Sequence, residues 1–247
     1  MAQAMRSQFT NTTMLKQSFT ITIALLLSAC STFQSQPPKN PPPLTTRASN
    51  VVQPVTSTEQ ESLRTLVALQ DRLYRVAAPL LLNNTELCKG NARHLLGFTA
   101  KNKYSYSAEF IEAAHQTFGL DERLQVMSVL SGGGAEKVGM KRGDTLVSIE
   151  DKPFPQGQNA EHQAASMLAP LLTGRSNVQL SVRRNNGTNQ TLTVPLTHAC
   201  AFGVVLGNSD NVMAYADGRR MMIARGMLNF VRNDEELAYV LAKEMAN

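Results

Sequence analysis

Residues 134–149 read GAEKVGMKRGDTLVSI. This stretch predicts a short helical turn that ends at Gly139, then a tight connection through Gly143 into a strand over residues 145–150. Both glycines suit backbone angles that residues with side chains resist. Apolar residues at 124–129 precede the turn, so we expect a strand before it as well as after it.

The sequence that follows predicts one helix and two strands. Apolar residues recur at helical spacing over 160–173, so we expect a helix with one apolar side; they are Ala164, Met167, Leu168, Leu171 and Leu172. Alternating runs at 178–182 and 192–196 predict strands, and Asn186-Gly187 between them is a hairpin turn signal. Together these elements predict a small sheet covered by one longer helix.

The order of these elements, together with the run at 134–149, resembles a bacterial PDZ domain over residues 117–197. Gly134 stands where that family often has proline. In the family, a peptide adds as a strand beside the module's second strand, between that strand and the long helix. The resemblance implies a peptide-binding site formed by Phe118, Gly119, Leu120, Leu124, Val126, Met167 and Leu171. Residues 118–120 would be the loop whose amides receive a terminal carboxylate.

Two acidic residues, Asp121 and Glu122, directly follow this expected carboxylate loop. Like charges near a carboxylate site oppose binding of the carboxylate. We therefore expect an internal or extended segment as the ligand, in preference to a free C-terminus. The alternative is a structural module that binds nothing.

A helix is expected before this module. Thr58 and Glu61 form a capping-box signal, and apolar residues then recur at helical spacing. These signals predict a helix over residues 59–78, and Pro79 indicates its end. Further along, residues 108–118 suggest a short helix, and a strand is expected near Tyr104 and Tyr106.

The first 29 residues have the pattern of a signal peptide. They carry basic residues and no acid, and their apolar run is much shorter than the roughly 20 residues of a spanning helix. The sequence Leu27-Ser28-Ala29-Cys30 resembles the lipobox of bacterial lipoproteins, which implies cleavage after Ala29 and lipid on Cys30. Ser31 after the cysteine implies sorting to the outer membrane. Translation starting at Met1 or at Met14 fits this pattern.

Residues 30–57 are rich in Pro, Gln, Ser and Thr and have too few apolar residues to bury a core, so we expect a tether. The folded part would stand in the periplasm, where extended segments of envelope proteins are the expected partners. Removing Arg6 and Lys16 from the 24 basic residues leaves 22 against 19 acidic ones. This near balance, without a basic block or aromatic platform, argues against nucleic acid as a partner.

Cys88 and Cys200 remain as an even pair once Cys30 is assigned to lipid. In an oxidising compartment such a pair favours a disulfide. The alternative is two buried free thiols, which are common as small apolar side chains.

The segment 198–247 resembles the beginning of the HtpX-like zinc metallopeptidase domain, a gluzincin family. In that family an edge strand lines the substrate cleft, and the matching residues here are Met213, Ala214, Tyr215 and Ala216. Asn233 and Glu236 can cap the next helix. On that helix, Leu237, Val240, Leu241 and Glu244 share one face.

The zinc-binding motif of that family, His-Glu-x-x-His, is altered in this chain. Two histidines four residues apart bind the metal, and the glutamate acts as general base on the bound water. Here Glu244 keeps the base position, but Lys243 and Asn247 replace the histidines, and an ammonium and a carboxamide are poor zinc ligands. The third ligand would lie downstream of Asn247. We therefore expect no metal site or cofactor in the chain as written, although intact family members carry zinc.

The sequence shows few other residues that could bind a metal, act as a nucleophile or bind a phosphate. The four histidines, His94, His115, His162 and His198, show no paired metal spacing, and we interpret them as surface residues or hydrogen-bonded core residues. No serine lies in a Gly-x-Ser-x-Gly elbow, and Gly132-Gly133-Gly134 lacks the lysine of a phosphate loop.

These observations predict an α+β lipoprotein of the cell envelope. Its expected parts are a signal peptide (1–29), a lipidated tether (30–57), a helical region (58–116), a PDZ-like module (117–197) and a truncated metallopeptidase-like segment (198–247). The expected function is non-catalytic peptide or protein binding, with Glu244 an inactive remnant of a catalytic base. The alternatives are a zinc-dependent endopeptidase of envelope quality control, represented by an incomplete chain, and a nonfunctional gene remnant.

Overall fold

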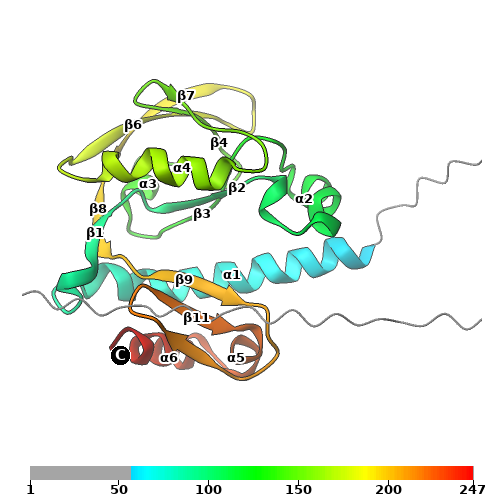
Figure 1. Ribbon diagram of the computed structural model, residues 1–247, viewed down its shortest axis with the longest axis vertical. Coiled ribbons are helices and arrows are strands. Elements are labelled where there is room, and N and C mark those ends of the chain that lie inside the picture. The colour runs from blue at the N-terminus through cyan, green and yellow to red at the C-terminus, as the bar shows by residue number, and fades with distance from the viewer. Residues whose placement is uncertain (1–56, 247) are drawn as a thin grey trace, which may run out of the picture. The chain divides into compact units, whose positions relative to one another are not determined.

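The computed structural model describes residues 57–246 of the chain (Figure 1). The predicted signal peptide, Cys30 and the tether lie outside the described residues, as does Asn247. Within residues 57–246, every helix is too short or too polar to span a bilayer. The fold is α+β, as the sequence predicts, with a long N-terminal helix and mainly antiparallel sheets.

A six-stranded sheet forms the PDZ-like module, with strand order β2-β3-β4-β6-β7 and β5 paired to β4. Its strands are β2 (Phe98–Lys101), β3 (Gln125–Val129), β4 (Thr145–Ile149), β5 (Lys152–Pro153), β6 (Asn177–Arg183) and β7 (Asn189–Pro195). All neighbouring strands are antiparallel. The hairpin between β6 and β7 turns at Asn186-Gly187, as predicted, and Gly187 adopts a positive φ of 84°.

Helix α4 (Ala160–Leu168) covers this sheet and continues as the 3₁₀ turn η4 (Ala169–Leu172). The buried side chains of β6 and β7 alternate with exposed ones, as in a strand with one face in the core. They share a core with Ala160, Ala164 and Leu171. The predicted helix over 160–173 therefore exists, but it changes to 3₁₀ geometry near Pro170, which lacks the N–H for an α-helical hydrogen bond.

The start of helix α3 (Gly134–Lys137) has room for glycine and not for proline at position 134. The backbone N–H of Gly134 donates to Thr197 Oγ1 at 2.6 Å. A Cβ at this position would lie 1.7 Å from the carbonyl oxygen of Pro195. Proline would both lose the hydrogen bond and collide with the end of β7.

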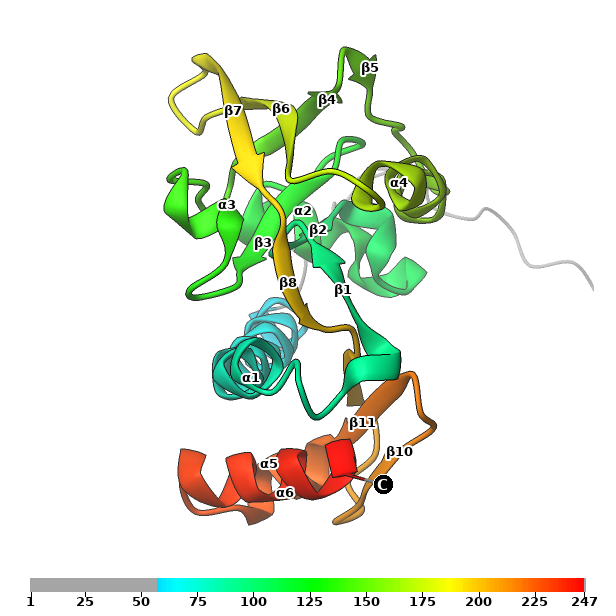
Figure 2. The same ribbon diagram turned by 90° about the vertical axis from the view of Figure 1, so that its left-hand side faces the viewer.

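Helix α1 (Ser57–Asn83) lies between the six-stranded sheet and the C-terminal part (Figures 1 and 2). One stretch of it packs with α2 (Ile111–Phe118), and a later stretch packs with the C-terminal strands and helices. The prediction that α1 ends near Pro79 is wrong. The helix continues because Leu81, beyond the proline, is buried in the core, and Asn84 Nδ2 donates to the carbonyl oxygen of Leu80 at 2.8 Å.

The expected strand near Tyr104 and Tyr106 is also wrong. Tyr104 lies in the 3₁₀ turn η2 (Lys103–Ser105), and a second turn, η3 (Ala108–Phe110), leads into α2. Asn102 causes the turn, since its side-chain oxygen accepts the N–H of Tyr104 while its own N–H donates to Ser105 Oγ. The expected helical region, 58–116, contains α1 and most of α2. It also contains the turn η1 (Lys89–Asn91) and the strands β1 (Ala92–Leu95) and β2.

Strand β1 pairs with β8 (Thr197–Cys200) in a separate two-stranded ribbon. The C-terminal part contains a three-stranded sheet with the order β10-β11-β9, built from β9 (Gly203–Gly207), β10 (Ala214–Ala216) and β11 (Arg220–Ala224). Helices α5 (Arg225–Phe230) and α6 (Asp234–Ala246) follow.

Asn233 Oδ1 accepts the N–H of Glu236, which confirms the predicted cap of α6. The predicted inward face of α6 is confirmed at Leu237, Leu241 and Glu244, which are buried.

Candidate functional site

The expected ligand strand over 124–129 has no free edge. This strand is β3, and it lies inside the sheet between β2 and β4. Leu124 and Val126 are buried in the core. A peptide therefore cannot add beside β3, and the predicted position of the ligand strand is wrong. The open edge of the sheet belongs to its neighbour β2.

The backbone of β2 points hydrogen-bonding groups outward. Phe98 is paired with Val129, and the N–H of Leu130 donates to the carbonyl oxygen of Gly97 at 2.8 Å. A bond between the flanking residues marks Phe98 and Val129 as a non-hydrogen-bonded pair. The N–H and C=O of Phe98 therefore point away from β3, toward the open edge.

Two more backbone donors lie at the start of this edge. Among residues 57–246, the N–H groups of Leu96 and Gly97 have no hydrogen-bond acceptor. Gly97 has a positive φ of 83°, so the chain turns sharply here. Successive amides in such a turn form a concave surface that attracts anions.

Helix α4 provides the second wall of this edge. Phe98 and Ala100 of β2 and Met167 of α4 are all half-buried and pack on the same core. Lys101 Nζ lies 3.3 Å from a carboxylate oxygen of Glu161, so an ion pair joins β2 to α4. We name Leu96, Gly97, β2 and α4 together the β2 edge (Figure 2).

The predicted carboxylate loop, Phe118-Gly119-Leu120, has another role. Gly119 adopts the left-handed conformation at the C-terminal cap of α2, and its N–H donates to the carbonyl oxygen of His115. Leu120 is fully buried, and the carbonyl oxygen of Phe118 accepts from Gln125 Nε2. Because these groups have partners within the fold, the loop is not the carboxylate receiver that the sequence suggested.

Asp121 and Glu122, which were expected to repel a carboxylate, share one lysine as their ion-pair partner. Lys103 Nζ lies 3.2 Å from Asp121 and 2.9 Å from Glu122. Its ammonium lowers the pKa of both carboxyl groups, and the hydroxyl of Tyr104 lowers that of Glu122 further. The single positive charge of Lys103 therefore offsets part of the negative charge of the two carboxylates.

The sequence contained a signal for the turn before β2. Leu95-Leu96-Gly97-Phe98 places a glycine between apolar residues immediately before a short strand. A glycine with positive φ directly before an edge strand is a common device for exposing backbone amides. The strand is only four residues long and has no alternation of buried and exposed side chains, so it was not predicted.

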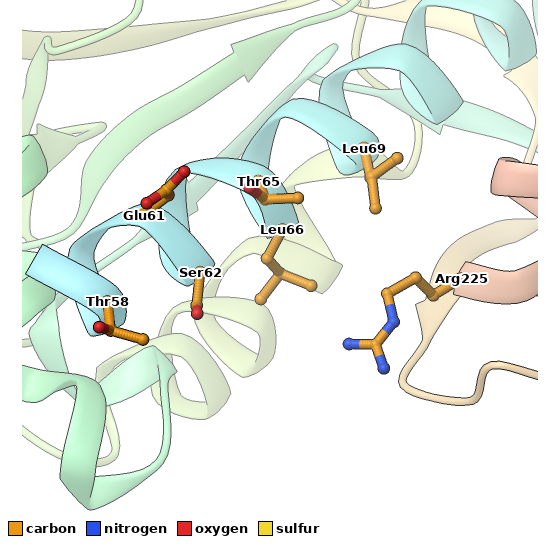
Figure 3. Close-up of a pocket in the computed structure, with 7 residues that line it drawn as sticks. All are labelled: Thr58, Glu61, Ser62, Thr65, Leu66, Leu69 and Arg225. Carbon is orange, nitrogen blue, oxygen red and sulfur yellow. The ribbon is translucent and has the colours of Figure 1, made fainter.

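Two surface cavities lie outside the β2 edge. One, of about 510 Å³, is lined by Phe118, Gly119, Gln125, Met127, Arg142, Gly143 and Asn185. The other, of about 340 Å³, is lined by Thr58, Glu61, Ser62, Thr65, Leu66, Leu69 and Arg225 (Figure 3). Arg225 is engaged by Asp210 at 2.8 Å and by Asn208 at 3.1 Å, so its charge is not free for a ligand in this cavity.

Lys243 and Glu244, which the sequence analysis compared with a zinc-binding motif, form an ion pair in the structure. Glu244 is buried, and Lys243 Nζ lies 2.9 Å from its Oε1. Among residues 57–246, no three His, Cys, Asp or Glu side chains gather closely enough to hold a metal ion. Residues 214–216 form the edge strand β10, as predicted, and Met213 and Tyr215 beside and within it are exposed.

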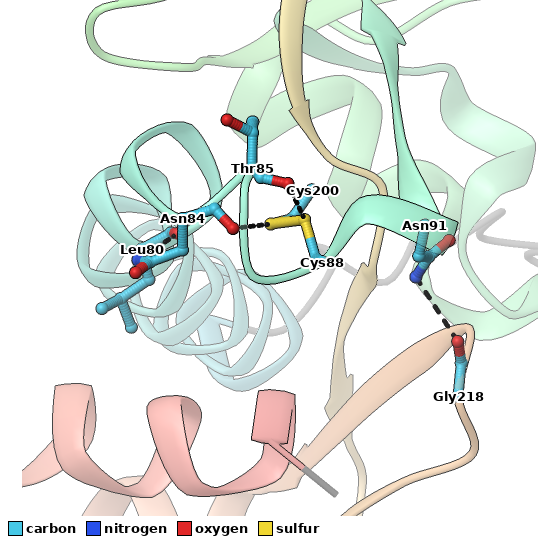
Figure 4. Close-up of a disulfide and its surroundings, with 7 residues drawn as sticks. All are labelled: Leu80, Asn84, Thr85, Cys88, Asn91, Cys200 and Gly218. Atoms are coloured by element: carbon cyan, nitrogen blue, oxygen red, sulfur yellow. Dashed lines mark hydrogen bonds between the residues drawn. A yellow bond between two sulfur atoms is a disulfide. The ribbon is translucent and has the colours of Figure 1, made fainter.

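The predicted disulfide between Cys88 and Cys200 is present, with a Cα–Cα distance of 5.8 Å (Figure 4). It joins the segment after α1 to the end of β8. Cys200 is buried, and its sulfur lies 3.3 Å from the carbonyl oxygen of Asn84. This contact is packing, since a disulfide sulfur has no hydrogen to donate.

The solved structures similar to this chain include PDZ domains. The HtrA3 PDZ domain bound to a phage-derived ligand (FGRWV) matches 43% of this chain and 88% of its own, with 15% identity and a TM-score of 0.31. The HtrA-type protease AlgW with decapeptide matches 43% of this chain with 23% identity and a TM-score of 0.30. A PDZ domain protein from Parabacteroides distasonis ATCC 8503 matches 43% with 19% identity and a TM-score of 0.30. The matches span 30% and 20% of the latter two proteins. No protein-family model and no curated protein matches the chain.

Proposed function

We propose that this chain is a peptide-binding protein in which an extended peptide adds as a strand to the β2 edge. The observation that carries the proposal is the position of β2 at the end of the sheet, with the N–H and C=O of Phe98 directed outward. Main-chain hydrogen bonds to such an edge give affinity, and side-chain pockets beside it give preference. The half-buried Met167 of α4 would contact the ligand's side chains.

A free C-terminus is the ligand end that the β2 edge supports best. The amides of Leu96 and Gly97 have no acceptor among the described residues and lie where the added strand would end. A carboxylate accepting several backbone N–H groups is stabilised as an anion. The sequence-based preference for an internal segment rested on Asp121 and Glu122, whose negative charge Lys103 partly offsets.

The test uses a random heptapeptide library, displayed with free carboxyl ends, to select a binding peptide. The peptide is then measured by calorimetry in its free-acid and amidated forms. We expect amidation, and the change Met167→Lys on α4, each to weaken binding at least about tenfold, which is roughly 1.4 kcal/mol. Thr193→Lys is the matched control, because Thr193 is exposed on β7 at the other end of the sheet. Equal peptide affinity in Met167→Lys and Thr193→Lys would mean that the peptide binds away from the β2 edge.

We also propose that the protein is anchored in the bacterial envelope by lipid on Cys30 and binds envelope proteins from the periplasmic side of the outer membrane. The lipobox-like sequence ending at Cys30 supports this location. Metabolic labelling with a radioactive fatty acid would mark the wild type and not Cys30→Ala. A wild-type chain that stays unlabelled and is recovered in the soluble periplasmic fraction would refute the anchor.

The C-terminal segment is proposed to be a non-catalytic relative of a zinc metallopeptidase. Support comes from Lys243 at a zinc-ligand position and from its ion pair with the carboxylate of Glu244. Zinc analysis of the purified chain, combined with a casein digestion assay, tests this directly. Stoichiometric zinc with chelator-sensitive cleavage that Glu244→Ala abolishes would establish the endopeptidase alternative instead.

A further inference from the structure

Two histidines that are far apart in the sequence lie side by side in the β1–β8 ribbon. His94 of β1 is the direct partner of His198 of β8. Their ring centroids are 5.3 Å apart, and the ring planes are tilted by 45°. Sequence spacing gave no hint of this pair, because antiparallel pairing between distant strands creates it.

The register brings the two side chains as close as a strand pair allows. The N–H of Ala201 donates to the carbonyl oxygen of Asn91 at 2.7 Å, which marks Ala92 and Cys200 as a non-hydrogen-bonded pair. Pair types alternate along an antiparallel ladder, so His94 and His198 are also a non-hydrogen-bonded pair. Side chains approach most closely at such positions.

Both rings are available to a ligand. His198 is exposed and His94 is half-buried. Neither ring forms a hydrogen bond within the described part of the chain, whereas His115 Nδ1 is engaged by the carbonyl oxygen of Leu120 at 3.0 Å. A neutral imidazole offers one unprotonated nitrogen, which is the group that binds transition metals.

We propose that His94 and His198 form a two-imidazole site for one divalent transition-metal ion. Imidazole suits Cu²⁺, Ni²⁺ and Zn²⁺, and the usual order of affinity makes Cu²⁺ the tightest of these. Within residues 57–246 no further His, Cys, Asp or Glu completes the site, so water fills the other coordination positions. Binding replaces two water ligands of the hydrated ion by two ring nitrogens, without redox change.

The metal ion would join β1 and β8, the strands that come directly before β2 and directly after β7 in the sequence. His94 directly precedes Leu95-Leu96-Gly97 at the start of the β2 edge, and β8 follows β7. The ion would therefore join β1 to β8 close to the disulfide, because His94 follows Cys88 and His198 precedes Cys200 by only a few residues. The proposal rests on the geometry of the ribbon and does not depend on peptide binding.

Copper titration of the full, untagged chain tests the site. Electron paramagnetic resonance with pulsed detection of imidazole nitrogens counts the histidines on each Cu²⁺. We expect one ion per chain with two coordinated imidazoles in the wild type. The double variant His115→Gln/His162→Gln keeps only the proposed pair and should give the same spectrum.

The single variants His94→Gln and His198→Gln should each weaken binding at least about tenfold, because loss of even an outer-shell partner costs roughly 10–100-fold in metal affinity. His162→Gln, an exposed histidine on α4, is the matched control and should bind as the wild type does. Circular dichroism checks that the variants fold. A spectrum with fewer than two imidazoles in the His115→Gln/His162→Gln chain would overturn the proposal, whatever the single variants do.

Discussion

Asp71 and Arg72 are neighbours on α1 and bind opposite parts of the molecule. Asp71 accepts from Ser128 Oγ of β3 at 2.8 Å and from Arg142, before β4. Arg72 donates to Asp234 at the start of α6 and to the carbonyl oxygen of Leu228 in α5. Successive residues on a helix point in different directions. One turn of α1 thus connects the PDZ-like module to the C-terminal part.

The ion pair between Asp71 and Arg142 should contribute modestly to stability. Both side chains are more than a third exposed, so solvent screens their attraction. In a double-mutant cycle with Asp71→Ala and Arg142→Ala, we expect a coupling energy of about 0.2–1 kcal/mol. Urea unfolding of the four proteins measures it. A coupling energy of zero would mean that this ion pair adds nothing to the other contacts that hold α1 on this side.

Asp217, in the turn between β10 and β11, should make stability depend on acid pH. It accepts the N–H groups of Arg219 and Arg220 and pairs with the Arg220 guanidinium, and these contacts lower its pKa from 3.8 to about 2. Because the folded pKa is the lower one, the stabilisation is complete well above the unfolded value and disappears as the pH falls from about 4 to about 2.

Asp217→Asn removes this titration while keeping the shape of the side chain. We expect the variant to be less stable than the wild type at pH 7, with the difference shrinking as the pH falls below 4. Urea unfolding at a series of pH values gives the free energy of unfolding against pH for the wild type and for the variant. Parallel curves over the whole range would show that Asp217 has the same pKa in the folded and unfolded chains.

The C-terminal helix α6 should be an integral part of the fold. Leu237 is fully buried in a core shared with Leu73 of α1 and Ile223 of β11. Leu237→Ala should lower the free energy of unfolding by roughly 2–5 kcal/mol. Tyr239→Ala, two residues along the same helix, is the matched control, because Tyr239 is 75% exposed and should change stability by no more than about 0.5 kcal/mol. Similar effects of the two changes in urea unfolding would contradict this packing.

The disulfide should stabilise the fold substantially, because it closes a long loop. Cys88 and Cys200 are 112 residues apart. Restricting a loop of this length in the unfolded chain is worth up to about 4.7 kcal/mol, and typical measured values are about 2–4 kcal/mol. The double change Cys88→Ala/Cys200→Ala should cost a similar amount in denaturant unfolding. If reductant destabilised this variant as much as the wild type, the effect would not come from the disulfide.

The sequence predicted strong periodic elements well. The run at 134–149, the hairpin at Asn186-Gly187 and the inward face of α6 are all present. In each, the local pattern and the tertiary burial agree, so the pattern alone was sufficient. The Cys88–Cys200 pair followed from counting cysteines.

The open edge of the sheet was not predicted because its strand is short. β2 has four residues, all half-buried, and therefore lacks the alternation that indicates a strand. Pro79 stopped the predicted helix early because the burial of Leu81 beyond it cannot be read from local propensity. The pairing of His94 with His198 is a long-range register and has no local signal.

Nuclear magnetic resonance of the ¹⁵N-labelled chain, titrated with the peptide selected from the free-carboxyl library, tests the central claim most directly. The backbone amide signals of Leu96, Gly97 and Phe98 should shift most, because these N–H groups face the open edge. Their hydrogen exchange should slow as the peptide saturates the protein. Shifts confined to residues 118–129, with unchanged signals at Leu96 and Gly97, would contradict the β2 edge as the binding site.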